Sequence, residues 1–349
     1  MPSIEVVWSY KLIRGKSMIK KIFLLGIFVS LSFTGCSVIK NQDTAAKKLN
    51  VVILDGQNNH AVWPKSTLMM KQYLEQSGLF NVDIYRTSNL WRSTGYNNII
   101  EQYPLNDGKN YQEYKEPKAD VDFSPNFEAY DVVVSNLGWK TAPWPVETKN
   151  AFEKYMRRGG GLVVVHAADN AFPEWKAYNE MIGLGGWGNR NKQHGPYVYY
   201  NDAGKLTRDF QAGGAGRHGK VQKFHIDIRD SSHPITQGLP ERWLHAPDEM
   251  YEHLRGPAQN MTILATAYPH YRKKEDARNE PVLMTLNYHK GRIFHTTLGH
   301  DQRAFEGVGF ITTFLRGAEW VATGKVTTPV PTDFPTETNA NIRTFDLPK

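Results

Sequence analysis

The sequence predicts an α/β fold, a mainly parallel sheet flanked by helices in a single domain. Short apolar runs that end at polar or glycine residues alternate with stretches of helical spacing, which is the pattern of βαβ units. Residues 157–168 show this most clearly, because a helix end, three glycines and a β-branched strand lead directly to His166. In open α/β sheets, ligands and reacting groups gather beyond the carboxyl ends of the strands. His166 therefore stands where a nucleophile would.

The elements of the first half follow from this alternation. The segment 66–77 carries apolar residues at helical spacing and Gly78 closes it, while 89–126 is polar and aromatic without a period and predicts an insertion over the site. The expected strands span 50–54, 82–86, 130–136 and 162–165, and the expected helices span 66–77 and 147–157.

The second half continues the pattern with a change in composition. Glycines dominate 183–219, and the last two strands predict a hairpin across Lys290-Gly291. The expected strands span 221–228, 262–267, 282–288 and 292–297, and the expected helices span 175–182 and 305–323.

The N-terminal residues predict a bacterial lipoprotein signal over 1–36. Met18, a candidate for the true start, is followed by basic residues, and 22–33 is apolar but short for a mature membrane span. Small residues precede Cys36, which would carry the lipid; an uncleaved membrane anchor is the alternative. We then expect a tether over 37–48, the domain over 49–325 and a Pro- and Thr-rich tail over 326–349. The expected location is the cell envelope, attached through the lipid anchor.

Composition excludes several classes of function. Cys36 is the sole cysteine, so the mature chain would have no disulfide, cysteine nucleophile or thiolate metal site. The net charge of +7 includes the basic leader, and no basic block follows it, so no nucleic-acid partner is expected. Residues 213–216 lack a following Gly-Lys-Ser/Thr, and no Gly-x-Ser-x-Gly elbow occurs, which argues against nucleotide binding and serine-hydrolase chemistry.

Several histidines occupy strand ends. His60, His166 and His300 follow predicted strands, and His295 lies within the last one. Since the carboxyl ends of parallel strands meet at one edge, we expect His60, His166 and His300 to face one cleft. A lone histidine is more often a hydrogen-bonded structural residue than a catalyst. For that interpretation to hold here, a structural histidine would have to occur by chance at three corresponding strand ends.

A second group of chemically active residues lies at 248–252. Asp248 and Glu249 are adjacent carboxylates, and Tyr251 follows them. A carboxylate beside an imidazole orients it or raises its basicity. An acidic first turn of a helix explains the same residues equally well. His233 opens a Pro- and Gly-containing turn, where a loop brace is the competing interpretation.

An ordered series of short motifs runs through the chain. They are Asn58-Asn59-His60-x-x-Trp63, Gly159-Gly160-Gly161-Leu162-x-x-x-His166-Ala167-Ala168, His233-Pro234-Ile235, Asp248-Glu249-x-Tyr251, Pro281-Val282, Gly291-Arg292-Ile293-Phe294-His295-x-x-Leu298-Gly299-His300-Asp301, and Trp320. Their order and spacing resemble the trehalose-utilisation (ThuA-like) family over about 50–324.

The resemblance implies a flavodoxin-like, class I glutamine amidotransferase-like fold that lacks the catalytic cysteine. His166 lies where those enzymes keep the cysteine. An imidazole cannot form the stable thioester of glutamine hydrolysis, so amidotransferase activity is not expected. The family is associated with the use of trehalose and related disaccharides through 3-keto-sugars. The resemblance also implies a sugar oxidoreductase in the same pathway. It is further compatible with a homodimer, because related folds often pair.

The first functional hypothesis is an enzyme that acts on 3-keto-glycosides or related disaccharides by hydrolysis, elimination or isomerisation. His166 would be the base, and Glu249 or Asp248 would orient it. His300 or His60 would polarise the carbonyl, directly or through a divalent metal whose candidate ligands are His60, His166 and His300.

The remaining expectations concern substrate contacts and the alternatives. Plentiful aromatic residues, 12% of the chain with nine tryptophans, suit stacking on sugars and equally suit an ordinary core. The alternatives are a membrane-tethered, non-catalytic sugar-binding protein and a partner-binding module. The candidate substrate-binding residues are His60, Trp63, Trp139, Trp187, Tyr251 and His233.

Overall fold

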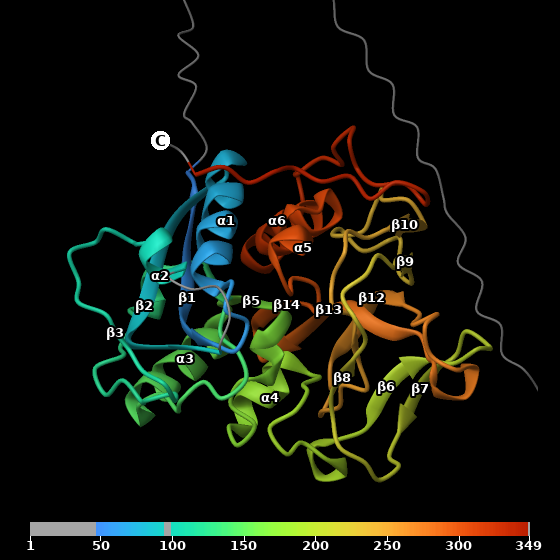
Figure 1. The fold of residues 1–349 in the computed structure, drawn as a ribbon, viewed down its shortest axis with the longest axis horizontal. Helices are drawn as coiled ribbons and strands as arrows, with labels where there is room; N and C mark the ends of the chain where they lie inside the picture. The colour runs from blue at the N-terminus through green and yellow to red at the C-terminus, as the bar shows by residue number, and fades with distance from the viewer. Residues whose placement is uncertain (1–46, 94–98, 348–349) are drawn as a thin grey trace, which may run out of the picture. The chain divides into compact units, whose positions relative to one another are not determined.

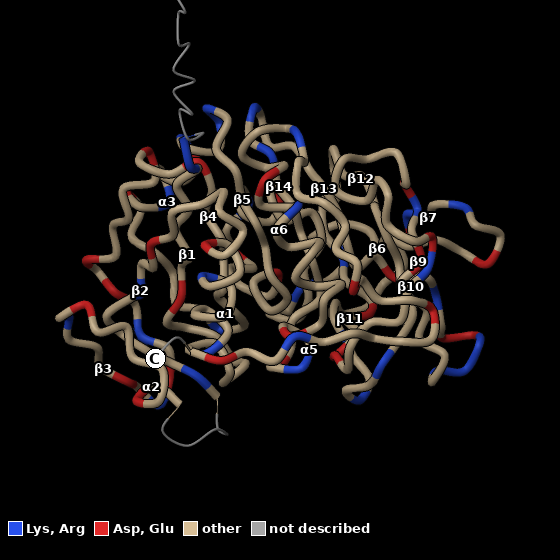
Figure 2. The backbone as a smooth tube through the Cα atoms, turned by 90° about the horizontal axis from the view of Figure 1, so that it is seen from above, with Lys and Arg blue, Asp and Glu red and all other residues tan. Residues whose placement is uncertain are grey.

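The centre of the domain is a mixed sheet, and its strands place the candidate site. Among the described residues the strands of this sheet are β1 (Leu49–Asn58), β2 (Phe80–Arg92), β3 (Gln112–Glu113), β4 (Val132–Ser135), β5 (Gly161–Val165), β9 (His225–Ile228), β10 (Arg242–Leu244), β12 (Met261–Ala267), β13 (Glu280–Tyr288) and β14 (Gly291–Thr296). Their order is β10-β9-β12-β13-β14-β5-β4-β1-β2-β3. Seen from above in Figure 2, this order runs across the domain, with basic and acidic residues interspersed along the chain.

The computed structural model describes residues 47–93 and 99–347, and Lys47–Lys349 form one compact unit. The predicted signal segment with Cys36, and nearly all of the tether, lie outside the described residues. None of the helices within the described ranges is both long and apolar enough to cross a membrane.

The mainly parallel α/β fold is confirmed, with an antiparallel extension at one end. β3, β2, β1, β4, β5 and β14 pair in parallel, whereas β13, β12, β9 and β10 continue from β14 in antiparallel order. The predicted hairpin across Lys290-Gly291 joins β13 to β14. The carboxyl ends of β1, β4, β5 and β14 therefore lie at one edge of the sheet.

Helices cover both faces of the sheet (Figure 1). The helices are α1 (Trp63–Gln76), α2 (Ile99–Gln102), α3 (Val146–Arg158), α4 (Lys176–Ile182), α5 (Gln302–Glu306) and α6 (Val308–Thr323). Val51 and Ile53 of β1 pack with α1, α5 and α6, and Val52 and Leu54 pack with α3 and α4. Burial on both faces explains why the central strands are continuous apolar runs.

Several boundaries differ from those predicted. The glycine-rich segment 183–219 contains a hairpin of β6 (Tyr197–Tyr200) and β7 (Leu206–Asp209), and a short strand β8 (Arg217–His218) that pairs with β11 (Tyr251–Glu252). These strands are too short to show a period among glycines. Of the predicted strand 221–228, only His225–Ile228 form a strand, which is β9.

The predicted closing helix 305–323 is two helices. Gly307 interrupts them with an extended backbone (φ −61°, ψ 124°) and forms a bridge with Ile342 of the C-terminal segment. That segment, drawn in red in Figure 1, packs against the domain: Leu244 donates to Thr336, and Phe334 and Phe345 are buried. The break in the helix thus provides the place where the chain end attaches.

Gly317 gives a direct test of how closely α6 lies on the sheet. A Cβ at this position would lie 2.1 Å from the Phe294 ring of β14, so Gly317→Ala forces the helix and strand apart. We expect the free energy of unfolding to fall by about 1–3 kcal/mol, the usual cost of overpacking a core. Urea denaturation measures it. Gly214→Ala, where a Cβ meets nothing within 4 Å, is the control, and equal stability of the two variants would contradict the close packing.

Candidate functional site

Three histidines and a glutamate meet at the carboxyl edge of the sheet. His60 follows β1, His166 follows β5 and His300 follows β14, while Glu249 comes from the loop between β10 and β11. One ligand atom from each of the four lies within 4.8 Å of the others. The structure therefore brings together the three histidines that were predicted to face one cleft. We call these four residues the His/Glu cluster.

His166 is fixed by its own backbone and by one hydrogen bond. Its φ of +45° is left-handed, a conformation that non-glycine residues rarely adopt and that concentrates at functional sites. Nδ1 lies 2.6 Å from the Thr297 carbonyl oxygen, which can only accept, so Nδ1 carries the proton. Nε2 then keeps a lone pair, and it is buried without a partner.

Burial keeps the His166 ring neutral. Removal from water, assisted by the charges of the neighbouring His60 and His300, lowers the pKa of His166 to about 3. The ring centroids of His60 and His166 are 4.7 Å apart, and burial lowers the pKa of His60 as well. Neutral imidazole with a free lone pair is the form that binds a metal or accepts a proton.

Glu249 supplies the negative charge of the cluster. Its Oε1 lies 2.9 Å from His218 Nδ1, and its Oε2 lies 3.1 Å from His300 Nδ1 and 3.7 Å from His60 Nε2. Burial alone would raise the pKa of Glu249, but the three neighbouring histidines lower it well below its usual range. Burial alone would lower the pKa of His300, but the adjacent Glu249 carboxylate outweighs this effect and raises it.

His218 was not among the predicted site residues. It lies on β8, directly opposite Tyr251 of β11, and this pairing brings its ring to Glu249. The hydrogen bond to Glu249 raises the pKa of His218. A two-residue strand in a glycine-rich segment leaves no recognisable signal, so only the fold could show the placement.

Asp248 holds the cluster from behind and does not line the pocket. Its Oδ1 accepts from the backbone N–H of Glu249 (2.8 Å) and of His300 (2.9 Å). Its Oδ2 accepts from the N–H of Gly299 (2.9 Å) and lies 3.0 Å from His245 Nε2. Asp248, predicted to be a catalytic carboxylate, is instead a fully buried clamp. It joins the loop that carries Glu249 to the loop that carries His300.

A pocket of about 420 Å³ opens beside the cluster, a size within the usual range for small-molecule sites. Its lining residues are Asn59, His60, Trp139, Asn170, Trp187, His218, Glu249, Tyr251 and His300. The Tyr251 ring stacks on His166, with ring centroids 4.1 Å apart. Of the predicted substrate contacts, the pocket therefore includes His60, Trp139, Trp187 and Tyr251.

Trp63 and His233 lie outside this pocket. Trp63 begins α1 and is fully buried, where its Nε1 donates to the Trp91 carbonyl oxygen and Arg86 stacks on its ring. His233 packs on Trp320, and its Nδ1 accepts from the Ile235 backbone in the turn. The interpretation of His233 as a loop brace fits this geometry.

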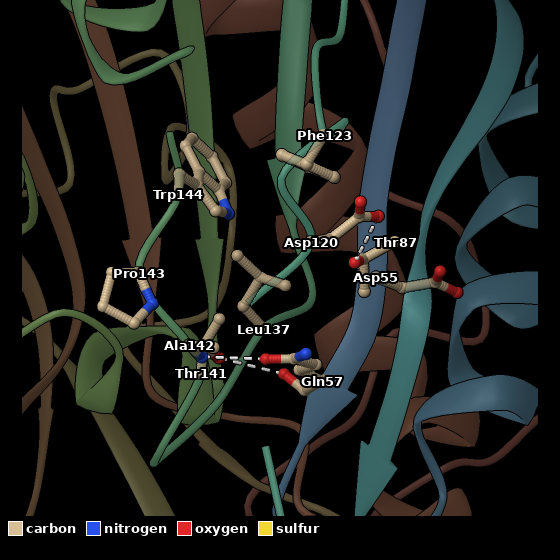
Figure 3. Close-up of a pocket in the computed structure, with 10 residues that line it drawn as sticks. All are labelled: Asp55, Gln57, Thr87, Asp120, Phe123, Leu137, Thr141, Ala142, Pro143 and Trp144. Atoms are coloured by element: carbon tan, nitrogen blue, oxygen red, sulfur yellow. Dashed lines mark hydrogen bonds between the residues drawn. The ribbon is translucent and has the colours of Figure 1, made fainter. Parts of the chain in front are cut away.

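A second, much smaller cavity of about 10 Å³, close to the size of one water molecule, lies between the end of β1 and the loop after β4 (Figure 3). On one side Thr87 donates to Asp120, and on the other Gln57 accepts from Thr141 and Ala142. The hydrogen bonds beside this cavity attach the loop after β4 to the end of β1. That loop carries Trp139 to the pocket.

The His/Glu cluster fits a divalent cation. Three imidazoles and one carboxylate are a common ligand set for zinc and similar ions. Ligand bonds of about 2.1 Å place ligand atoms about 3.4 Å apart in a tetrahedron and about 4.2 Å apart across an octahedron. The observed limit of 4.8 Å requires only small side-chain movements. The unpartnered Nε2 of His166 is the kind of buried atom that a cation would satisfy.

Asp248→Asn tests the clamp. The amide keeps the size of the side chain but replaces one acceptor with a donor, so two hydrogen bonds to a charged group are lost. We expect a loss of about 2–4 kcal/mol in the free energy of unfolding at neutral pH, measured in urea. Bonding from His245 lowers the pKa of Asp248 against the effect of burial, so this stabilisation is present above pH 3.8 and is lost as pH falls below it.

Exposed Asp276 provides the matched control. Asp276→Asn should leave the free energy of unfolding unchanged within about 0.5 kcal/mol. An Asp248→Asn protein as stable as the wild type would refute the clamp.

Comparisons with known proteins agree with this fold. The chain matches the family profile described as "ThuA: Trehalose utilisation" over residues 50–321. A putative ThuA-like protein from Parabacteroides merdae is 41% identical; the match covers 85% of this chain and 98% of that one, with a TM-score of 0.72. A putative ThuA-like protein from Bacteroides uniformis is 18% identical, with 81% and 94% covered and a TM-score of 0.49. The comparison with curated proteins gave no match.

Proposed function

This chain belongs to the ThuA (trehalose utilisation) family, and from that membership we propose that it is an enzyme acting on a glycoside at the His/Glu cluster. The family membership predicted from the sequence motifs is confirmed, and it supports a carbohydrate-related role. The observation that carries the enzymatic proposal is the convergence of His60, His166, His300 and Glu249 beside the pocket. Binding alone would not need four ionisable groups packed around one point.

We propose that the cluster holds a divalent cation. One nitrogen of each histidine and one oxygen of Glu249 would be its ligands, and Thr297 and Asp248 would hold those ligands in place. A bound cation would supply Lewis-acid polarisation of a substrate carbonyl. A hydrogen bond like that from His166 Nδ1 to the Thr297 carbonyl oxygen is typical of metal sites, where it fixes the tautomer and the orientation of the ligand ring.

The substrate class that we propose is a 3-keto-glycoside or a related disaccharide. A ketone at C3 acidifies the proton on C2. In an elimination, a base takes this proton, and the electron pair of the broken C2–H bond forms the C1–C2 double bond. The glycosidic oxygen leaves C1 and takes up a proton. Hydrolysis and isomerisation begin with the same polarised ketone.

The same geometry offers a metal-free version. His166 Nε2, neutral and buried beside the pocket, would then be the base that takes the proton. A residue cannot bind a cation through Nε2 and accept a proton there at once. Chelation therefore separates the two versions.

The experiment is incubation of the purified protein with 3-keto-trehalose, with the products read by mass spectrometry. We expect release of a monosaccharide unit, loss of turnover after chelation and recovery with Zn²⁺ or Mn²⁺. His166→Gln should lower turnover by about 10²-fold or more, whichever version holds. His270→Gln, at an exposed histidine, is the control and should keep full turnover.

Each negative result has a definite meaning. Turnover that survives chelation would overturn the metal proposal and leave His166 as the base. Unchanged turnover by His166→Gln would overturn the role of the cluster. Binding of the sugar without any turnover would overturn the enzymatic proposal in favour of a sugar-binding protein.

A further inference from the structure

Trp187 is held in the pocket at a conformational cost. Its φ of +50° is left-handed, a strained conformation that is rare for a bulky aromatic residue. The peptide before Trp187 is fixed, since the Trp187 N–H donates to Ala215 and the Arg190 side chain donates to the Gly186 carbonyl oxygen; after it, the Trp187 carbonyl oxygen accepts from the Arg190 backbone N–H. A Cβ at position 216 would lie 2.7 Å from the indole, so Gly216 leaves the room that this ring needs.

Trp187 is also the tryptophan linked to the His/Glu cluster. Its ring lies 4.8 Å from that of Tyr251, which stacks on His166. It lies 5.9 Å from the ring of His218, which contacts Glu249. A sugar ring against Trp187 would therefore be the unit beside the reacting centre.

The backbone at Trp139 is also fixed by hydrogen bonds, and its side chain lies near solvent. That side chain is 37% exposed, and the Lys140 ammonium lies 4.9 Å from the centroid of its ring. The Trp139 N–H donates to Asn59 Oδ1, and the N–H of Gly138 donates to Gln57 and Thr141. Asn59 is the chain neighbour of His60, so the same short segment positions Trp139 and one member of the cluster.

The pocket that holds both tryptophans also has polar lining residues. Asn59, Asn170 and His218 supply amide and imidazole groups that can hydrogen-bond to hydroxyls. An aromatic face combined with such groups matches a pyranose, which has an apolar face of C–H bonds and a polar edge of hydroxyls.

We propose that Trp187 and Trp139 define two successive sugar subsites, an inner one beside the cluster and an outer one at the rim. This inference rests on the proposed function and deepens it. The inner ring would pack on Trp187 and Tyr251, and the second ring would pack on Trp139. The pocket then selects a two-unit glycoside over a monosaccharide, and Trp139 is the specificity-determining residue.

The test measures binding of trehalose and of glucose by calorimetry, with turnover of 3-keto-trehalose measured in parallel. The wild type should bind trehalose more tightly than glucose. Trp139→Ala should lose about tenfold more affinity for trehalose than for glucose, whereas Trp187→Ala should weaken both sugars by similar factors. Phe210→Ala, which removes an exposed aromatic ring outside the pocket, is the control and should change neither affinity.

The outcomes separate this inference from the proposed function. A wild type without preference for trehalose, or a Trp139→Ala protein that keeps the preference, overturns the two subsites. If 3-keto-trehalose is still turned over in that case, the proposed function stands. Absence of both binding and turnover would overturn both proposals. Thermal melting of each variant identifies any loss that comes from unfolding.

Discussion

The Asp248 carboxylate ties together the two loops on which the rest of the site depends. Its oxygens accept from the backbones of Glu249, Gly299 and His300, and one of them lies beside His245. Charge-assisted bonds of this kind are strong in a buried setting, and they leave neither loop free to drift. Glu249 can then face three histidines at once. Without this clamp, the carboxylate and His300 would sit on independently moving loops, and neither a cation nor a substrate would meet a preformed site.

Strain and buried polar groups occur together around the pocket. His166 and Trp187 both have left-handed backbones, and His166 Nε2 is buried without a partner. Each feature lowers the stability of the fold, and the well-packed sheet beneath offsets this loss. In β5, Val163 and Val165 lie in one hydrophobic core, and Leu162 and Val164 lie in the other. At this edge two left-handed residues, His166 and Trp187, lie beside a pocket that also borders an unpartnered imidazole nitrogen, a combination that favours a functional role.

Much of the fold, and part of the site, could be predicted from the sequence. Apolar runs of strand length identified the central strands, and the convergence of parallel strand ends brought His60, His166 and His300 together as expected. His218 could not be predicted, because its position depends on a two-residue strand pairing across the chain. Trp63 illustrates the opposite problem: an aromatic ring suited to stacking on a sugar was predicted to contact substrate, but at the start of α1 it is fully buried and Arg86 stacks on it. Sequence spacing fixes which strand end a residue follows, whereas tertiary packing decides which way its side chain points.

The central claim is that the His/Glu cluster is a cation site. Anomalous diffraction from crystals of the purified protein grown with zinc tests it directly. We expect one strong peak about 2.0–2.2 Å from a nitrogen of each of His60, His166 and His300 and from an oxygen of Glu249. An empty cluster at saturating zinc, or zinc bound only at other residues, would contradict it.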